Sequence, residues 1–376
     1  MSELTTFFAT CAPGLEPILH KEIQDLRMAK VERQVGGVRF SGKTIDMQRA
    51  NLWLRTAGRV LMRIARYEAH GSDGLYDGAK EVAWENWLKP GATLRVDSQT
   101  RDSDLDHSRF IEQRIKDAIV DRVTDLGWSR PNVVGEEADL RVHAHLFKDR
   151  VTLSLDSSGA ALRKRGWRVA QGRAPLAETM AAAMVLHSGW DGRSPLVDPF
   201  CGSGTLLIEA ALWATQTAPG SFERTFGFQS WADYEPKLWK RLLDEARAQV
   251  KPLGKAPILG YDSSSQRITE ARANLENAGF ADKIVLAKGD ATNFEAKRGW
   301  NAHILTNPPY GVRVGDEQQM VPLYMGFAKH LREVGAGYHL TLLTQPTLVA
   351  SLGMPQLAQI PVRNGAIDCT LLKGDL

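Results

Sequence analysis

The stretch "PLVDPFCGSGTLLIEAAL" at residues 195–212 decides the fold. It starts as a short apolar run, passes through an aspartate and a glycine-rich turn, and continues as an apolar helical segment. This order of strand, loop and helix is typical of parallel α/β sheets, in which ligands bind beyond the carboxyl ends of the strands. The sequence therefore predicts a ligand site along this turn.

The same order recurs through the C-terminal half of the chain. Candidate strands lie at residues 195–200, 257–262, 283–290, 302–309 and 338–345, and helices are expected to start near Thr205, Ser265 and Val321. Two β-rich runs then flank Arg363, Asn364 and Gly365, which is a hairpin signal. We expect a doubly wound, Rossmann-like α/β sheet whose last strand is antiparallel.

The first part of the chain has a different, α+β pattern. Strands are predicted at residues 5–13, 36–42 and 92–100, helices at 15–26 and 108–127, a helix followed by a strand within 50–69, and a hairpin within 138–159. Residues 159–172 interrupt the pattern. The sequence therefore predicts a boundary between two parts of the chain there.

Composition narrows the class of protein. The chain has 376 residues, 43% of them hydrophobic and 24% charged, and a formal net charge of +3. We found no apolar segment long enough for a membrane span and no secretory signal, so we expect a cytoplasmic protein with no membrane partner. The three cysteines are far apart, which favours neither disulfides nor a metal site. The charge permits a nucleic-acid partner.

Acidic residues end three of the candidate strands. Asp198, Asp262 and Asp290 would meet at one edge of the sheet, beside the turn Gly202–Gly204. The loop lacks the GxGxxG dinucleotide fingerprint and the chain lacks a P-loop, so a cofactor without phosphates fits better, namely S-adenosylmethionine. Asp262 would accept hydrogen bonds from the ribose, Asp290 would hold the adenine edge, and Asp198 would face the methionine end. A single strand-end aspartate is more often a cap or turn former.

A fourth strand ends in Asn307-Pro308-Pro309-Tyr310. The prolines fix the backbone and leave carbonyl oxygens as acceptors. The Asn307 side-chain oxygen and the Pro308 carbonyl would hold the hydrogens of an exocyclic amine, while Tyr310 would stack on a flipped base. The alternative is a proline-rich turn that merely ends the strand.

Several blocks resemble a known family. These are "KRGWR" with "GRAPLAETMAAAMVL", "DPFCGSGTLLIEAAL", "GYDSSSQRI", "KGDATNF" and "TNPPYG", together with "CAPGLEPILHKEI", "GGVRFSG", "ANLWLRTAGRVLMRI" and "KDAIVDR". They resemble the bacterial large-subunit (23S) rRNA guanine-N2 methyltransferases that carry a THUMP domain. The resemblance implies a class I S-adenosylmethionine-dependent methyltransferase, and it covers nearly the whole chain.

The resemblance also implies a domain layout. We expect a ferredoxin-like region at residues 1–60, a THUMP domain at 61–158, a linker at 159–174 and a methyltransferase domain at 175–376. Some members carry a second methyltransferase domain, and this chain stops after one, so a single activity is expected. The oligomeric state is left open, and no obligate protein partner is indicated.

The substrate is less closely defined than the chemistry. Near relatives act on tRNA, so a tRNA guanine-N2 methyltransferase is the first alternative to an enzyme of 23S rRNA. A DNA adenine-N6 methyltransferase is also compatible with NPPY, although the THUMP-like half argues against it. A non-catalytic RNA-binding assembly factor would keep the fold without the reaction, and the intact acids disfavour it.

The site residues follow from the motifs and the resemblance together. Among them, Glu178 is expected to contact the cofactor, but it is equally well explained as a carboxylate in the first turn of a helix. Target contacts are expected from Asn307, Pro308, Pro309 and Tyr310, and cofactor contacts from Pro175, Leu176, Glu178, Asp198, Gly202, Ser203, Gly204, Thr205, Asp262, Asp290, Ala291 and Asn307.

Basic residues cluster just before the methyltransferase part of the chain. Arg163, Lys164, Arg165 and Arg168 are the expected RNA contacts, because phosphates favour such clusters; a solvated linker explains them almost as well. Further on, Phe228 and Trp231 lie in an aromatic and basic segment, where packing as a local cover is favoured over base stacking.

Overall fold

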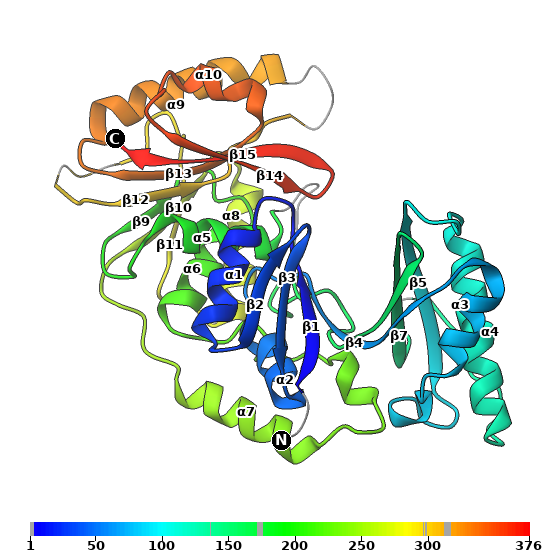
Figure 1. The fold of residues 1–376 in the computed structure, drawn as a ribbon. Helices are drawn as coiled ribbons and strands as arrows, with labels where there is room; N and C mark the ends of the chain where they lie inside the picture. Colours follow the sequence, from blue (N-terminus) through cyan, green and yellow to red (C-terminus); the bar gives the residue numbers. More distant parts are fainter. Residues whose placement is uncertain (1–3, 136, 171–175, 296, 298, 312–316) are drawn as a thin grey trace.

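The computed structural model describes residues 4–135, 137–170, 176–295, 297, 299–311 and 317–376, and contains two β-sheets (Figure 1). One sheet is built by the N-terminal part of the chain and the other by the C-terminal part. Among the described residues, no helix combines the length and the apolar character that a membrane crossing requires.

The N-terminal sheet has eight strands in the order β2-β3-β1-β4-β8-β7-β5-β6. Its strands are β1 (Thr5–Thr10), β2 (Ala29–Gln34), β3 (Gly37–Gly42), β4 (Arg59–Glu68), β5 (Thr93–Arg101), β6 (Asn132–Val133), β7 (Leu140–Phe147) and β8 (Arg150–Asp156). Its helices are α1 (Glu16–Asp25), α2 (Thr44–Trp53), α3 (Gly71–Lys80) and α4 (Ser108–Asp125), with a 3-10 turn at Trp84–Asn86. β4 pairs with β1 on one side and β8 on the other, so one strand joins both halves of the sheet.

Two elements of the N-terminal part of the chain, β2 and α3, lack the sequence patterns by which strands and helices are predicted. β2 is an edge strand with almost no buried side chain, so its sequence shows no apolar alternation. α3 contains Gly74 and Gly78, which lower helix propensity. At Gly78 a Cβ would lie 2.3 Å from the ring of Tyr67, so close packing of α3 on β4 requires glycine there.

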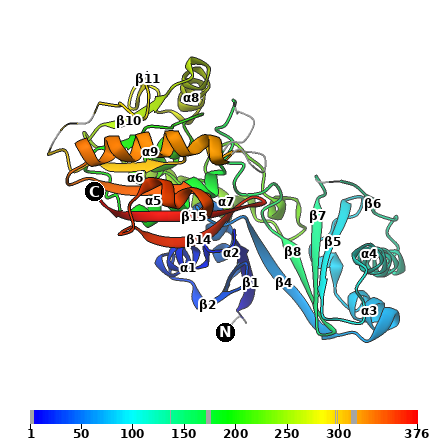
Figure 2. The same cartoon turned by 90° about the horizontal axis from the view of Figure 1, so that it is seen from above.

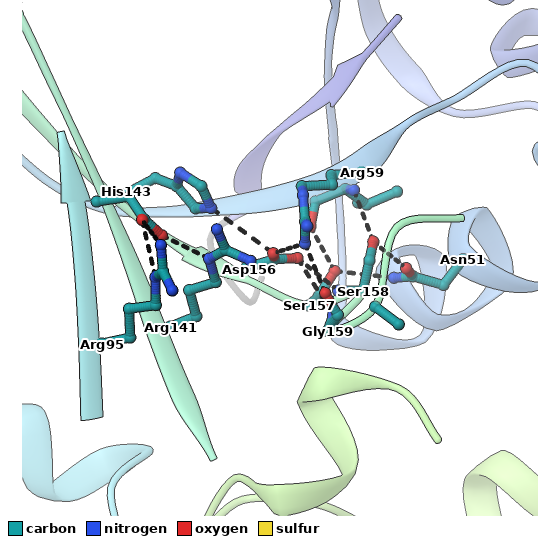
Figure 3. Close-up of polar contacts among 12 residues, drawn as sticks. Asn51, Arg59, Arg95, Arg141, His143, Asp156, Ser157, Ser158 and Gly159 are labelled. Atoms are coloured by element: carbon teal, nitrogen blue, oxygen red, sulfur yellow. Dashed lines mark hydrogen bonds and ion pairs between the residues drawn. The ribbon is translucent and has the colours of Figure 1, made fainter. Parts of the chain in front are cut away.

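A polar network joins β8 to α2 and β4 where the strand ends (Figure 3). Asn51 of α2 donates to the Ser157 hydroxyl at 2.8 Å and accepts from the Ser158 hydroxyl at 2.6 Å. Next to them the buried carboxylate of Asp156 pairs with Arg59 of β4. Asn51, Asp156, Ser157 and Ser158 are buried and satisfied by these contacts, so they fix the path of the backbone as it leaves the N-terminal sheet.

The C-terminal sheet has seven strands in the order β11-β10-β9-β12-β13-β15-β14, parallel except for β15, which runs antiparallel to both its neighbours. Its strands are β9 (Leu196–Asp198), β10 (Ile258–Asp262), β11 (Val285–Lys288), β12 (His303–Thr306), β13 (His339–Thr344), β14 (Ala358–Asn364) and β15 (Ile367–Asp375). The helices of this part of the chain are α5 (Glu178–Ser188), α6 (Thr205–Ala214), α7 (Pro236–Ala248), α8 (Ser265–Ala278), α9 (Glu317–Val334) and α10 (Val349–Leu352), with 3-10 turns at Gly227–Ser230 and Pro346–Leu348. The predicted doubly wound sheet and its antiparallel last strand are confirmed.

The segment between α6 and β10 packs away from the C-terminal sheet. Phe228 and Trp231 are buried, and the Phe228 ring meets the Trp239 ring of α7 edge to face at 5.2 Å between centroids. Both residues belong to the apolar core of the N-terminal sheet. The interpretation of this segment as a cover is therefore confirmed, although it covers the N-terminal sheet.

The two sheets meet along α1 and α2. β14 of the second sheet lies beside α1 of the first (Figure 2), and the backbone amide of Arg363 donates to the Pro13 carbonyl at 3.2 Å. Gly14 has φ of +89°, and a Cβ there would lie 2.2 Å from the Pro361 carbonyl oxygen. Any other residue at this position would separate the two parts of the chain.

A buried charge network lies in this interface. Arg165 donates to the Glu209 carboxylate of α6 at 3.3 Å, to the Leu162 carbonyl at 2.8 Å and to the Arg55 carbonyl. Arg55, in the loop after α2, donates to the Thr217 carbonyl at 2.8 Å. Both arginines and Glu209 are almost fully buried, so the two cations depend on the Glu209 carboxylate for compensation, and Glu22 adds a second negative charge near Arg55.

We predict that Glu209→Ala is strongly destabilising. Its loss leaves the buried guanidinium of Arg165 without its carboxylate and removes one of the two carboxylates near Arg55, and removal of one partner from a buried ion pair typically costs about 3–5 kcal/mol. Chemical denaturation would measure this loss. As a control, Glu245→Ala removes the exposed carboxylate that pairs with Arg241 on α7, and its midpoint should stay close to that of the parent. Equal midpoints for both variants would contradict the role given to Glu209.

Candidate active site

A cavity of about 1400 Å³ opens at the carboxyl ends of the parallel strands. Since β9, β10, β11 and β12 are neighbours and run in the same direction, the residues that follow them meet at one edge. The lining includes Leu176, Glu178, Asp198, Gly202, Ser203, Thr205, Asp262, Asp290, Ala291 and Asn307 to Tyr310. Gly204 does not line it, and Pro175 lies outside the described residues.

Asp198 is the most buried carboxylate on the strand-end wall of this cavity. Its Oδ1 accepts from the Thr306 hydroxyl at 2.7 Å and from the Phe200 amide at 3.1 Å. Burial raises its pKa to about 7, and the nearby negative charge of Asp262 adds to the increase. A buried carboxylate that loses its proton near neutral pH favours a cationic ligand, because a positive charge would restore the ionised form.

The glycine turn is fixed to the next strand end. The Gly202 amide donates to Asp262 Oδ2 at 3.1 Å, while the Ser264 amide donates to Oδ1 at 2.8 Å. Gly202 and Gly204 have φ of +52° and +83°, which favours glycine at both positions. Asp262 therefore orients the turn while it lines the cavity. Asp290 is exposed, and hydrogen bonds from the Thr292 amide and hydroxyl hold its pKa below the usual range.

Arg168 closes one side of the cavity and is a correction to the expected RNA contacts. Its guanidinium donates to Glu178 Oε1 at 2.7 Å, to the Ser203 hydroxyl at 3.1 Å and to the Thr205 hydroxyl at 2.9 Å. These bonds commit the cation to the cavity wall at the start of α6. The prediction that Arg168 reaches outward to RNA is therefore wrong in this structure.

Arg165 is the second correction. Its side chain is 2% exposed and is held by Glu209 within the interface between the two parts of the chain. A buried, paired guanidinium is not available to a phosphate. Arg163 and Lys164 are exposed at the rim of the cavity, so these two residues of the basic cluster stay predicted RNA contacts.

Asn307 holds the least satisfied polar atom of the site. Its Oδ1 is buried and finds no hydrogen-bond partner among the described residues. A buried acceptor without a partner costs free energy, and such atoms mark places where a ligand supplies the missing donor. Pro308 is buried, and the Tyr310 hydroxyl accepts from the Asn364 amide at 2.9 Å. Burial raises the pKa of Tyr310 to about 12, so its hydroxyl stays protonated at neutral pH.

The structure adds residues that the sequence analysis missed. Asn274 of α8 is fully buried; its Oδ1 accepts from the Val169 and Ala170 amides at 2.9 Å each, and its Nδ2 donates to the Ser203 carbonyl at 2.9 Å. It thereby ties the segment after Arg168 to the glycine turn. An asparagine on the apolar face of a helix was the available signal. Thr306 and Asn364 carried no such signal, because their roles depend on contacts across the fold.

The strand order, the reversed last strand and the cavity at the strand ends define the class I methyltransferase fold. Comparisons with known protein families agree: the "RMKL-like, methyltransferase domain" model matches residues 165–373, the "RlmL ferredoxin-like domain" model matches residues 6–61, and the "THUMP domain" model matches residues 70–156. The chain belongs to this RMKL-like methyltransferase family.

Two named relatives match nearly the whole of this chain but differ in how much of their own length is matched. A "Ribosomal RNA large subunit methyltransferase K/L" from Methylococcus capsulatus is 38% identical over 98% of this chain and 51% of its own length. A "Putative RNA methyltransferase" from Synechocystis is 36% identical over 98% of this chain and 96% of its own. The chain thus spans about half the length of the K/L enzymes.

Two solved structures share the fold over nearly the whole chain. The putative methyltransferase SMU.472, complexed with SAH, superposes with a TM-score of 0.89 at 29% identity, covering 99% of this chain and 98% of its own. A predicted N6-adenine-specific DNA methylase from Listeria monocytogenes superposes with a TM-score of 0.87 at 32% identity, covering 99% and 96%. The names given to these relatives therefore refer to RNA in some cases and to DNA in another.

We predict that Asp198→Asn increases stability at alkaline pH. Because the folded-state pKa lies above the unfolded value of 3.8, the folded protein holds the proton more tightly, and the free energy of unfolding falls as pH rises from about 4 to about 7. Over roughly three pKa units the fall is on the order of 4 kcal/mol. The free energy of unfolding of parent and variant would be measured by denaturation at pH 5 and at pH 8. The change between the two pH values should be smaller for the variant. Equal changes for the two proteins would contradict the raised pKa.

Proposed function

We propose that this chain is an S-adenosylmethionine-dependent RNA methyltransferase that methylates the exocyclic N2 amine of a guanosine in 23S rRNA. The observation that carries the proposal is the buried Oδ1 of Asn307, which has no hydrogen-bond partner in the part of the chain that the structure describes and lies in a cavity with an acidic strand-end wall. This oxygen is a hydrogen-bond acceptor, and an exocyclic amine has two N–H donors, one of which could satisfy it. The membership of the chain in a methyltransferase family, with rRNA methyltransferases among its relatives, supports the same reaction.

The cavity residues fit S-adenosylmethionine. When bound, this cofactor supplies an electrophilic methyl group on a sulfonium. Asp262, Asp290 and Ala291 line the cavity; Asp262 would accept hydrogen bonds from the ribose diol, and Asp290 with Ala291 would border the adenine. Asp198, Glu178 and the turn Gly202–Ser203 would hold the charged methionine end, where negative charge stabilises an ammonium and a sulfonium.

The target amine needs orientation more than a strong base. The lone pair of guanine N2 is delocalised into the ring, which makes it a poor nucleophile. Asn307 Oδ1 and the Pro308 carbonyl would accept its two hydrogens and turn the lone pair toward the methyl group, as Tyr310 stacks on the base. Transfer of the methyl group would join it to N2 and release the sulfur as a neutral thioether, and the methylated nitrogen would lose its extra proton to solvent.

The N-terminal part of the chain is proposed to place the RNA. It would comprise a ferredoxin-like region at residues 1–60 and a THUMP domain at 61–158, followed by the segment 159–174 and the methyltransferase domain at 175–376. Arg163 and Lys164 extend from that segment at the rim of the cavity, where they would meet phosphates beside the target nucleotide.

Rival functions differ in the product they predict. A tRNA guanine-N2 methyltransferase would use the same site on another RNA. A DNA adenine-N6 methyltransferase would use Asn307 on a different amine, and the name of the Listeria relative is of that kind. A non-catalytic assembly factor would bind RNA without transfer, and the complete set of strand-end acids disfavours it.

One experiment tests the proposal against these rivals. Methyl transfer from labelled S-adenosylmethionine would be measured side by side on unmodified large-subunit rRNA, small-subunit rRNA, tRNA and DNA, followed by nucleoside analysis. N2-methylguanosine in large-subunit rRNA alone is the expected result. The same nucleoside in tRNA would show that tRNA is the substrate instead of 23S rRNA. N6-methyladenine in DNA would overturn the proposal that guanine is the target base.

We predict that Asn307→Ala abolishes transfer and leaves cofactor binding largely intact. Its amide would act on the target amine in the transition state, and loss of one such oriented group typically costs about 100- to 1000-fold in rate. Single-turnover transfer would measure the rate, and calorimetry with S-adenosylhomocysteine would measure binding. Asn132→Ala, on the exposed edge strand β6, is a matched control that should alter neither. A rate within a few-fold of the parent for Asn307→Ala would rule out the amine clamp.

A further inference from the structure

The tip of the β14–β15 hairpin reaches into the candidate active site. Asn364 and Gly365 line the same cavity as Asn307, Pro308 and Tyr310. Gly365 has φ of +64°, so the hairpin turns tightly at this point and presents the side chain before it. A residue from the last two strands therefore lies beside the proposed target pocket, although its position in the sequence carries no catalytic motif.

The amide of Asn364 has a defined orientation. Its Nδ2 donates to the Tyr310 hydroxyl at 2.9 Å, so the hydroxyl oxygen is the acceptor of this contact. The hydroxyl hydrogen is then left for another acceptor. In this contact the nitrogen end of the Asn364 amide faces Tyr310.

Two hydrogen-bonding groups of Asn364 then remain for a ligand. One N–H of Nδ2 and the carbonyl oxygen Oδ1 form no side-chain hydrogen bond with any other residue that the structure describes. Asn364 is half-buried and lines the cavity. Adjacent donor and acceptor groups of this kind complement a base edge that carries an acceptor beside a donor.

We propose that Asn364 is a specificity residue that reads the Watson–Crick edge of the target guanine. Oδ1 accepts from guanine N1–H, and the remaining N–H of Nδ2 donates to O6. This assignment rests on the proposed function, in which Asn307 and Pro308 hold the N2 amine. Since N2, N1 and O6 follow one another along the same edge, the strand end and the hairpin tip divide the recognition of one base between them.

The arrangement discriminates guanine from adenine by chemistry. Adenine presents an acceptor at N1 and donors at N6, the reverse of guanine N1–H and O6. In the observed arrangement the Asn364 amide faces the Tyr310 hydroxyl with Nδ2, and a flip of the amide would require the hydroxyl to turn its hydrogen toward Oδ1. Unpaired polar groups in a desolvated pocket are costly, so the wrong base is rejected by the loss of these two bonds.

The test compares two bases that share the reacting amine. After the target guanosine has been mapped, synthetic RNA spanning it would carry guanine or 2-aminopurine there; 2-aminopurine keeps the amine at C2 but lacks O6 and N1–H. The parent protein is expected to methylate guanine about 10- to 100-fold faster, the discrimination of one bidentate contact. Asn364→Ala should reduce the guanine rate to near the 2-aminopurine rate and leave the latter almost unchanged.

The outcomes separate this role from a merely structural one. If Asn364 only supports Tyr310, Asn364→Ala would slow both substrates by the same factor and keep their ratio, which would overturn the proposal. Asn364→Asp should lower the guanine rate at least as much, because a carboxylate repels O6. Asp368→Asn, an exposed change on the same hairpin, should keep both rates. Absence of N2-methylguanosine from every RNA would overturn the proposed function as well, whereas its presence with an unchanged ratio overturns this inference alone.

Discussion

The buried pair of Arg165 and Glu209 is the constraint on which the rest of the structure depends. Arg165 belongs to the connection between the two sheets, Glu209 to the helix that follows the glycine turn, and the Arg55 carbonyl to the N-terminal part of the chain. A guanidinium in this place cannot be solvated, so it is stable only while all three segments are together. Because α6 starts at the glycine turn, the same pair positions the floor of the active site relative to the N-terminal sheet.

The four basic residues before the methyltransferase part of the chain illustrate what a sequence can predict and what it cannot. Charge and spacing locate Arg163, Lys164, Arg165 and Arg168 as one cluster, and phosphate contact is a reasonable expectation for each. The structure separates them because Glu209 pairs with Arg165 and Glu178 pairs with Arg168, whereas Arg163 and Lys164 stay exposed. The partners of a side chain are properties of the tertiary fold, and periodicity contains no information about them.

The strand-end acids were predictable for the opposite reason. Their position follows from local pattern plus one general rule, that parallel neighbours share an edge. The alternation of strands and helices and the reversed last strand could be derived from local signals in the same way. β2 and α3 could not, since backbone pairing at an edge and close packing at Gly78 replace the apolar repeat on which such predictions rely.

A pocket that reads one base cannot choose one guanosine among the many in an RNA. Asn307 and Asn364 would recognise only the groups of a single nucleotide, so selection of the position must come from surfaces beyond the cavity. The N-terminal sheet is joined to the methyltransferase sheet through Arg165, Gly14 and the contact of Arg363 with Pro13. RNA bound to that sheet would therefore be held at a fixed distance from the cavity. This distance would select which guanosine enters the cavity, a choice that contacts with a single base cannot make.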